Sequence, residues 1–240
     1  MGYNKIWVCY LEISKKLPFG QEPLDELLSG GIEHKALTNL YGPPGCGKTN
    51  IVLIATNSCI KKGKKVIFID TEGGFSPERF SQISKDFENA SQKIILIEPK
   101  TFEEQDKVIT ELENKFDNDV GLIVLDSLVN LYRLELDEDN FQKINKMLST
   151  QLAILSKMSR EKDIPVLITN HMYTSNGGTQ PVSRDITKYW SKCLVELIKL
   201  DKGKRVAILR KHRSIPEGKE VHFKITQDGV VPAEKKFKLF

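Results

Sequence analysis

The residues Gly42-Pro43-Pro44-Gly45-Cys46-Gly47-Lys48-Thr49 fit the pattern G-x-x-x-x-G-K-[S/T] in full. A strand-like run, residues 36–41, precedes them, and a helical pattern, residues 48–60, follows them. In this context the glycines let the backbone wrap closely around phosphate oxygens, and the helix N-terminus adds partial positive charge. The sequence therefore predicts a phosphate-binding loop (P-loop), with a plain glycine-rich turn as the alternative.

The loop residues have distinct predicted roles in binding ATP and Mg²⁺. The backbone of residues 42–49 should cradle the phosphates. Lys48 should reach the β- and γ-phosphates and neutralise charge during transfer, so it counts as both a binding and a catalytic residue. Thr49 should offer its hydroxyl to Mg²⁺.

Outward from this loop, short apolar runs alternate with helical patterns. The pattern predicts an α/β fold with a mainly parallel central sheet and antiparallel C-terminal strands. The first five runs are nearly all apolar, as expected of strands buried on both faces, and the last three alternate. We expect one ATPase domain over residues 1–240, with an N-terminal extension (1–16) and a basic tail (233–240). The expected strands are residues 36–41, 65–70, 93–98, 122–126, 166–170, 193–200, 205–211 and 221–226.

Helix signals lie between these strands. Ser76 should cap a helix that has Pro77 in its first position, and Thr101 with Glu104 forms a possible capping box. Apolar stripes, which we expect to lie in the core, follow in two helices. They comprise Val108, Ile109, Leu112 and Phe116 in one, and Phe141, Ile144, Met147, Leu148, Leu152 and Leu155 in a long helix ending near Glu161.

Two predicted strands end in acids. Asp126 follows Leu122-Ile123-Val124-Leu125, and ligands of parallel sheets bind at the carboxyl ends of strands, so Asp126 is a candidate for the Mg²⁺ shell. It could instead cap the next helix. Glu72, in Asp70-Thr71-Glu72, is a candidate base for the water that attacks the γ-phosphate.

Composition narrows the class of protein. No apolar run approaches the roughly 20 residues of a membrane helix, so we expect a cytoplasmic chain without membrane contact. The four cysteines form no C-x-x-C pair, so neither a zinc site nor a redox motif is indicated. The net charge is +4, and residues 199–240 hold 12 Lys/Arg against 5 Asp/Glu. This basic third indicates either a polyanionic partner or a solvated, lysine-rich surface.

Several collinear segments over about residues 17–230 resemble the archaeal and eukaryotic RecA-family recombinases. They are Pro23-Leu24-Asp25-Glu26-Leu27-Leu28-Ser29-Gly30-Gly31-Ile32-Glu33, Asp70-Thr71-Glu72-Gly73-Gly74-Phe75-Ser76-Pro77-Glu78-Arg79-Phe80, Leu125-Asp126-Ser127-Leu128, Asn145-Lys146-Met147-Leu148 and Ile168-Thr169-Asn170. The resemblance implies a RecA-like core in which Glu72 is the catalytic glutamate. It also implies that Arg79 packs against adenine and that Pro216 belongs to a segment covering the base. His171 stands where the family has a γ-phosphate-sensing Gln, so we expect it to take that role.

The departures from this pattern are as specific as the matches. We find no preceding helix-hairpin-helix domain and no polymerisation sequence, and the expected first DNA-binding loop, residues 134–140, is short and acidic. The second loop, residues 172–189, is reduced. This combination resembles the archaeal RadB family, short paralogues of RadA. It implies an accessory role in recombination and repair, DNA binding, weak ATP hydrolysis, and partnership with a RadA-type recombinase and a junction nuclease; a homo-oligomer is possible.

Four basic residues are candidates for contacts with DNA or with a neighbouring subunit's ATP: Arg184, Lys188, Lys211 and Arg213. Lys211 and Arg213 are two apart, so they should share a face of an extended chain. A solvated strand edge is the alternative interpretation.

Two other functions remain open at this point. One is a nucleotide-gated protein-binding module with negligible ATPase activity, which the reduced loops favour. The other is a KaiC-like regulatory ATPase, which the segment from Asp70 to Phe80 disfavours.

Overall fold

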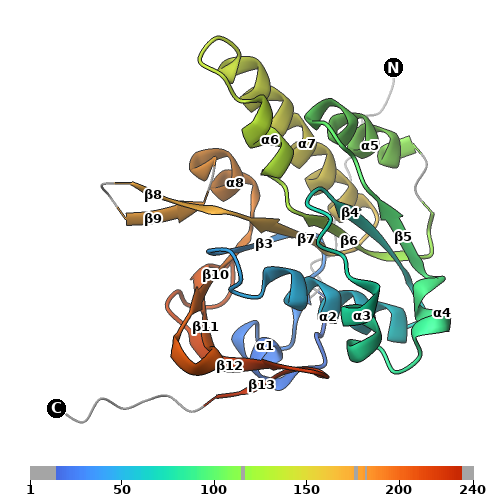
Figure 1. Ribbon diagram of the computed structural model, residues 1–240. Coiled ribbons are helices and arrows are strands. Elements are labelled where there is room, and N and C mark those ends of the chain that lie inside the picture. The colour runs from blue at the N-terminus through green and yellow to red at the C-terminus, as the bar shows by residue number, and fades with distance from the viewer. Residues whose placement is uncertain (1–14, 115–116, 176–177, 182, 234–240) are drawn as a thin grey trace, which may run out of the picture.

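The computed structural model describes residues 15–114, 117–175, 178–181 and 183–233. Its centre is a nine-stranded sheet in the order β13-β12-β11-β10-β3-β7-β6-β4-β5 (Figure 1). From β10 to β5 all neighbours are parallel, whereas β10 to β13 pair antiparallel, as the sequence predicts. The strands are β3 (Leu37–Tyr41), β4 (Lys65–Asp70), β5 (Ile94–Ile97), β6 (Val120–Asp126), β7 (Val166–Asn170), β10 (Cys193–Lys199), β11 (Lys204–Lys211), β12 (Glu220–Thr226) and β13 (Gly229–Pro232).

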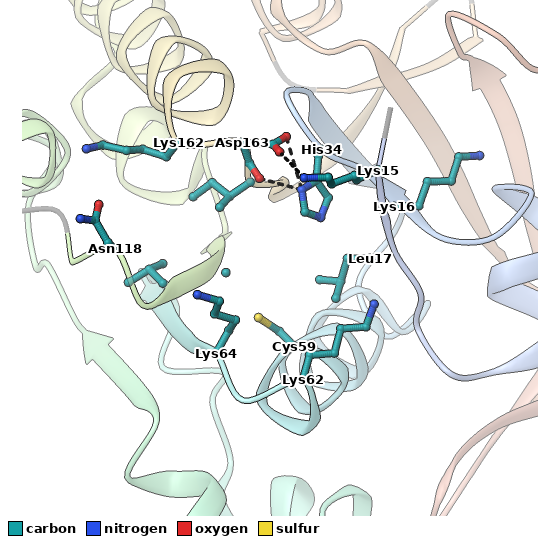
Figure 2. Close-up of a pocket in the computed structure, with 13 residues that line it drawn as sticks. Lys15, Lys16, Leu17, His34, Cys59, Lys62, Lys64, Asn118, Lys162 and Asp163 are labelled. Carbon is teal, nitrogen blue, oxygen red and sulfur yellow. Dashed lines mark hydrogen bonds and ion pairs between the residues drawn. The ribbon is translucent and has the colours of Figure 1, made fainter. Parts of the chain in front are cut away.

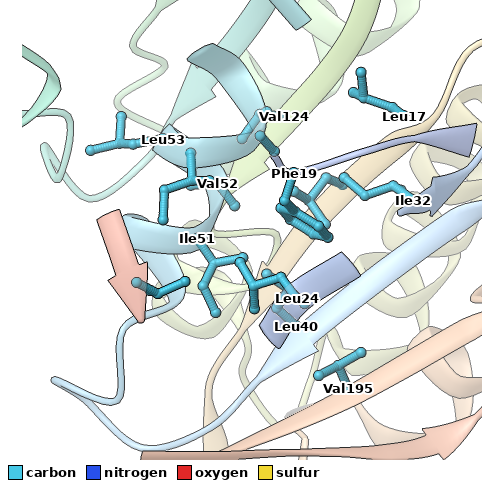
Figure 3. Close-up of a cluster of buried hydrophobic side chains, with 14 of the residues drawn as sticks. Leu17, Phe19, Leu24, Ile32, Leu40, Ile51, Val52, Leu53, Val124 and Val195 are labelled. Atoms are coloured by element: carbon cyan, nitrogen blue, oxygen red, sulfur yellow. The ribbon is translucent and has the colours of Figure 1, made fainter. Parts of the chain in front are cut away.

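Helices cover both faces of this sheet and create two apolar cores (Figure 1). Successive residues of the inner strands point to opposite faces, so Phe68 enters the first core and Ile69 the second. Figure 3 shows part of the first core, where Ile51 and Val52 of α2 lie near Leu40 of β3. The first core is covered by α1 (Glu22–Leu27), α2 (Lys48–Lys61), α3 (Pro77–Ile83) and α4 (Phe87–Ser91), and the second by α5 (Phe102–Asn114), α6 (Asn130–Glu135), α7 (Phe141–Glu161) and α8 (Arg184–Trp190).

The predicted helix starts are observed with their capping bonds. Ser76 Oγ accepts the backbone N–H of Arg79 at 3.0 Å, and Pro77 opens α3. Thr101 Oγ1 accepts the N–H of Glu104 at 3.1 Å, but the Glu104 carboxylate bonds the N–H of Lys100 at 2.7 Å. The reciprocal bond of the capping box is therefore made to the N–H of Lys100, one residue before Thr101.

Two burial predictions are wrong, and each has a positional reason. The strand expected at residues 93–98 was grouped with strands buried on both faces, yet β5 is the sheet edge, where Ile95 is 40% and Leu96 43% exposed. Phe141 was placed in the apolar stripe of α7, but it opens the helix and is 49% exposed. Phe116, in the other stripe, lies outside the described residues.

Several short elements gave no usable pattern in the sequence. They are β1 (Lys16–Leu17) paired with β2 (Ile32–Glu33), the hairpin of β8 (Met172–Ser175) and β9 (Gly178–Pro181), the 3₁₀ turn Asp201–Gly203, and β13 at the sheet edge. Among the described residues, no helix combines the length and apolarity needed to cross a bilayer.

Candidate nucleotide site at the carboxyl edge of the sheet

The P-loop joins β3 to α2 and is tightly enclosed. A Cβ on Gly42 would lie 2.3 Å from the Leu197 carbonyl oxygen, and Gly47 has a left-handed φ of +109°. Both positions therefore require glycine. Lys48 Nζ donates to the carbonyl oxygens of Gly42 at 2.9 Å and Pro43 at 3.2 Å, so its ammonium group stays within the loop instead of entering the core.

Thr49 and Asp126 meet beside this loop. Thr49 Oγ1 donates to Asp126 Oδ2 at 2.8 Å, and Thr169 Oγ1 donates to the other carboxylate oxygen. Asp126 is 3% exposed. Burial raises the pKa of its carboxyl, the two hydroxyl bonds lower it, and the charges of Glu72 and Asp70 raise it further. A buried carboxylate beside a hydroxyl is a donor set suited to Mg²⁺, which takes one or two protein oxygens and completes its shell with phosphates and water.

The described residues hold no cluster of three or more His, Cys, Asp or Glu side chains that could bind a metal by themselves. A cation at the Thr49–Asp126 pair would therefore need additional ligands from a bound phosphate or from water.

Glu72, Ser127 and His171 form a connected group at the ends of three adjacent strands. They follow β4, β6 and β7, which are neighbours in the sheet. His171 Nε2 lies 2.6 Å from Glu72 Oε1, and Ser127 Oγ donates to the same oxygen. The hydrogen bond with His171 is the largest influence on the Glu72 carboxyl; it lowers the pKa against the opposing effect of burial, with further lowering from Ser127 and Lys48. Glu72 and His171 belong to separate sequence motifs, and the structure brings them into direct contact and adds Ser127.

Asp70 shapes the turn that carries Glu72. Its carboxylate accepts three backbone N–H groups, from Glu72 at 3.0 Å, Gly74 at 3.1 Å and Phe75 at 2.8 Å. The side chain is 2% exposed. Asp70 therefore fixes the path of the chain after β4, a role that the sequence signalled only as a second acid in the motif.

Arg79 links α3 to the end of β12 on the P-loop side of the sheet. Nε donates to Asn50 Oδ1 at 2.7 Å, and the terminal nitrogens donate to the carbonyl oxygens of Thr226 at 2.8 Å and Gln227 at 2.9 Å. Its packing against adenine stays a prediction, since these bonds use the edge of the guanidinium group and involve neither planar face.

Arg205, absent from the predicted site, lies against the P-loop. Its terminal nitrogens donate to the carbonyl oxygens of Gly203 at 2.8 Å and Gly45 at 3.5 Å, and its Nε is buried without a hydrogen-bond partner. A Cβ on Gly47 would lie 3.5 Å from that Nε. In the sequence, Arg205 is marked only by its place near the start of a predicted strand. In the structure β11 runs antiparallel to β10, and this direction places Arg205 beside the P-loop.

Lys211, Arg213 and Pro216 lie at the opposite edge of the sheet. Lys211 is in register with Leu194, which pairs with Asn39 in the middle of β3, and Arg213 bonds Glu33, which precedes β3. The P-loop instead follows Tyr41 at the carboxyl end of that strand. The structure therefore does not bring these three residues to the P-loop of the same chain.

The two basic residues at this opposite edge have different partners. Arg213 Nε donates to Glu33 Oε2 at 2.6 Å, and Lys211 Nζ donates to the Lys188 carbonyl oxygen at 2.7 Å. Lys211 ends β11 and Arg213 lies in the following turn, so the expected shared face of an extended chain is not formed. Pro216 is exposed in that same turn.

The second-loop candidates lie on or beside α8. Lys188 is exposed, and Tyr189, 72% exposed, contacts Trp190 with ring centroids 5.4 Å apart. Arg184 opens α8, but its side chain lies outside the described part of the chain, as do residues 234–240 of the predicted basic tail.

Comparisons with known proteins agree with this geometry. A family model described as Rad51 matches residues 14–233. The chain is 43% identical to the "DNA repair and recombination protein RadB" of Methanococcus maripaludis, over 89% of this chain and 99% of that protein. It is also 43% identical to the protein of the same name from Methanococcoides burtonii, over 91% and 98% of the two chains.

A solved structure described as "Crystal structure of the RadB recombinase" superposes with a TM-score of 0.80 at 37% identity, covering 91% of this chain and all of that one. The expected resemblance to RadB and the RecA-like fold are thereby confirmed.

Proposed function

Because this chain belongs to the Rad51 family, we propose that it is an ATP- and DNA-binding accessory protein of homologous recombination and DNA repair with weak ATP hydrolysis. The observation that supports this most directly is the convergence of the P-loop, Asp126 and the Glu72–His171 pair on one edge of the sheet. We treat residues 1–240 as a single RecA-like ATPase domain.

In this proposal ATP lies along the P-loop. Lys48 exchanges the carbonyl oxygens of Gly42 and Pro43 for phosphate oxygens, which are stronger acceptors because they are charged. Thr49 and Asp126 would hold Mg²⁺, which would neutralise phosphate charge when bound.

Glu72 is the proposed general base, and its surroundings favour slow turnover. One carboxylate oxygen already accepts hydrogen bonds from Ser127 and His171, and the lowered pKa makes the carboxylate a weaker base. His171 can sense the nucleotide by exchanging Glu72 for a terminal phosphate oxygen. Since His171 directly precedes β8, that exchange would be transmitted to the β8–β9 hairpin in the second loop.

The test uses single substitutions in the full chain. Lys48→Ala should weaken binding of a fluorescent ATP analogue at least about tenfold, since a charge-assisted contact is worth about 1.5–3 kcal/mol. Glu72→Gln should bind normally and lose phosphate release. Lys85→Ala, an exposed lysine in the connection before α4, is the matched control. Unchanged nucleotide affinity in Lys48→Ala would contradict the proposal.

A second candidate function is a nucleotide-gated binding module with negligible turnover, favoured by the same commitment of Glu72 to His171. Its proposed partners are a RadA-type recombinase, a junction nuclease or a second copy of this chain. Partner binding should then differ between ATP, ADP and no nucleotide while phosphate release stays at background. Equal binding in all three states would exclude gating.

Arg184, Lys188, Lys211 and Arg213 remain proposed contacts for DNA or for a neighbouring subunit's nucleotide. For Lys211 and Arg213, a nucleotide contact would have to be with another chain, because their own P-loop lies across the sheet. Concentration-dependent ATP hydrolysis that Lys211→Ala abolishes would support the contact between subunits. A loss of DNA affinity without a change in hydrolysis would support DNA.

A further inference from the structure

A second cleft opens at the amino-terminal edge of the parallel strands. It has a volume of about 530 Å³, within the usual range of ligand sites. Figure 2 shows its walls, which come from β1, the residue after β2, the α2–β4 turn, the start of β6 and the end of α7. Leu17, Val120 and Ile164 form its apolar part.

The walls of this cleft are strongly basic. The lining includes Lys15, Lys16, Lys62, Lys64 and Lys162, with Asp163 as the only acidic residue among the lining side chains that the structure describes. Asp163 is already neutralised: its carboxylate lies 3.3 Å from Lys15 Nζ and 3.9 Å from Lys35 Nζ, and His34 lies 3.6 Å away. Just outside the cleft, Asp117 is paired with Lys65 at 2.7 Å, and Asp119 is exposed.

Two lysines of the α2–β4 turn present positive charge to the cleft, and the Asp117 carboxylate, which acts on Lys64, is itself paired with Lys65. Lys62 and Lys64 are exposed, and their ammonium groups make no ion pair with any residue in the described ranges. Gly121 allows the stem of Lys64 to lie flat on β6, because a Cβ there would be 2.7 Å from Lys64 Cβ and 2.9 Å from Cys59 Sγ. Burial raises the pKa of Cys59 to about 12, so the thiol on the floor stays neutral and does not offset the lysines.

This lysine-lined cleft is separate from the nucleotide site. It lies where β4 and β6 begin, whereas the P-loop, Glu72 and Asp126 lie where parallel strands end. Strands of this length span roughly 20 Å at about 3.3 Å per residue, so one ligand group cannot occupy both sites.

We propose that this cleft, here called the basic cleft, binds the sugar-phosphate backbone of duplex DNA independently of nucleotide; the choice of DNA as ligand rests on the function proposed above. Within the described ranges the lining cations are lysines and no arginine, which suits contact with phosphate oxygens as point charges. Among the lining residues that the structure describes there is no Phe, Tyr or Trp to stack an unpaired base. A duplex, with its bases turned inward and its phosphates outward, matches that combination.

The test compares Lys62→Gln/Lys64→Gln with a control of equal charge change, Lys85→Gln/Lys107→Gln, at exposed sites away from the cleft. Glutamine keeps part of the Lys64 stem that packs on Gly121. A labelled duplex is titrated from 50 to 300 mM salt, with and without ATP. Losing two phosphate contacts should reduce the slope of log K against log salt by about 1.8, and affinity at 0.1 M salt should fall by about 10- to 60-fold.

The same loss should occur with and without ATP, and binding of the fluorescent ATP analogue should match wild type. This last measurement separates the two proposals, since failure of the P-loop assignment would appear in nucleotide binding and not in the salt slope. A wild-type slope and DNA affinity in the cleft variant would overturn the inference. An equal loss of DNA affinity in the control variant would also overturn it. Polyglutamate, titrated in parallel as a polyanion without a nucleic-acid backbone, gives the last check: a cleft variant that loses affinity for polyglutamate but keeps its affinity for DNA would overturn the inference too.

Discussion

Asp70 offers a direct test of how the turn after β4 places the proposed base. In Asp70→Asn, the remaining carbonyl oxygen can still accept the N–H groups of Glu72 and Gly74, but the new amide nitrogen faces the N–H of Phe75. One charge-assisted hydrogen bond is lost and a donor is left opposite a donor, which costs about 2 kcal/mol. For a chain of 240 residues that loss lowers Tm by about 4–8 °C.

The functional effect should be larger on hydrolysis than on binding. A shift of about 1 Å in Glu72 slows phosphate release by about 10- to 100-fold, while the nucleotide Kd changes less than about threefold because the P-loop is a separate segment. Thermal melts, analogue titration and phosphate release on Asp70→Asn measure this, with the exposed Asp119→Asn as control. A variant that melts within 1 °C of the control (about 0.3 kcal/mol) and hydrolyses ATP at the wild-type rate would refute the reasoning.

Three other substitutions probe the same edge of the sheet. Asp126→Asn should raise Tm in Mg²⁺-free buffer, because burial raises the pKa of this carboxyl and the amide removes a buried charge. The same variant should weaken Mg²⁺-dependent nucleotide binding. A lower Tm would contradict the first expectation. Since His171 lowers the pKa of Glu72, ionised Glu72 contributes stability above its ordinary pKa of 4.5 that is lost as the pH falls below it through the lowered value. His171→Ala should therefore reduce the loss of unfolding free energy that urea titrations record as the pH falls from about 6 to about 3. The same pH dependence in the variant and the wild type would count against the Glu72–His171 pair. Arg205→Ala should reduce nucleotide affinity about 3- to 10-fold, because the Gly45 carbonyl oxygen loses its hydrogen bond from Arg205. A Kd equal to that of the wild type would show that this hydrogen bond does not support the P-loop.

Features carried by consecutive residues were predictable. The P-loop joins a strand to a helix as its pattern indicates, and Ser76 caps α3 through a bond three residues away. Successive residues of β4 and β6 point alternately into the two apolar cores. Both faces of these strands are therefore covered, which explains why their runs are almost wholly apolar. Such signals succeed because they depend on backbone geometry and local periodicity.

Features that depend on the neighbours of a strand were not predictable. The run at β5 has the same composition as the buried strands, and only its place at the edge exposes Ile95 and Leu96. Likewise, β13 becomes a strand because β12 offers it an unpaired edge, although it ends in Pro232.

Local sequence patterns were enough to identify the P-loop, its Lys48 and Thr49, and the acids at the ends of β4 and β6, since each is defined by residues close together in the chain. Other arrangements are visible only in the folded chain. His171 contacts Glu72, Arg205 lies against the P-loop while Lys211 and Arg213 lie across the sheet, and lysines from separate segments line one cleft. The physical reason is that strand order and direction set which ends meet, and these depend on packing among distant segments of the chain.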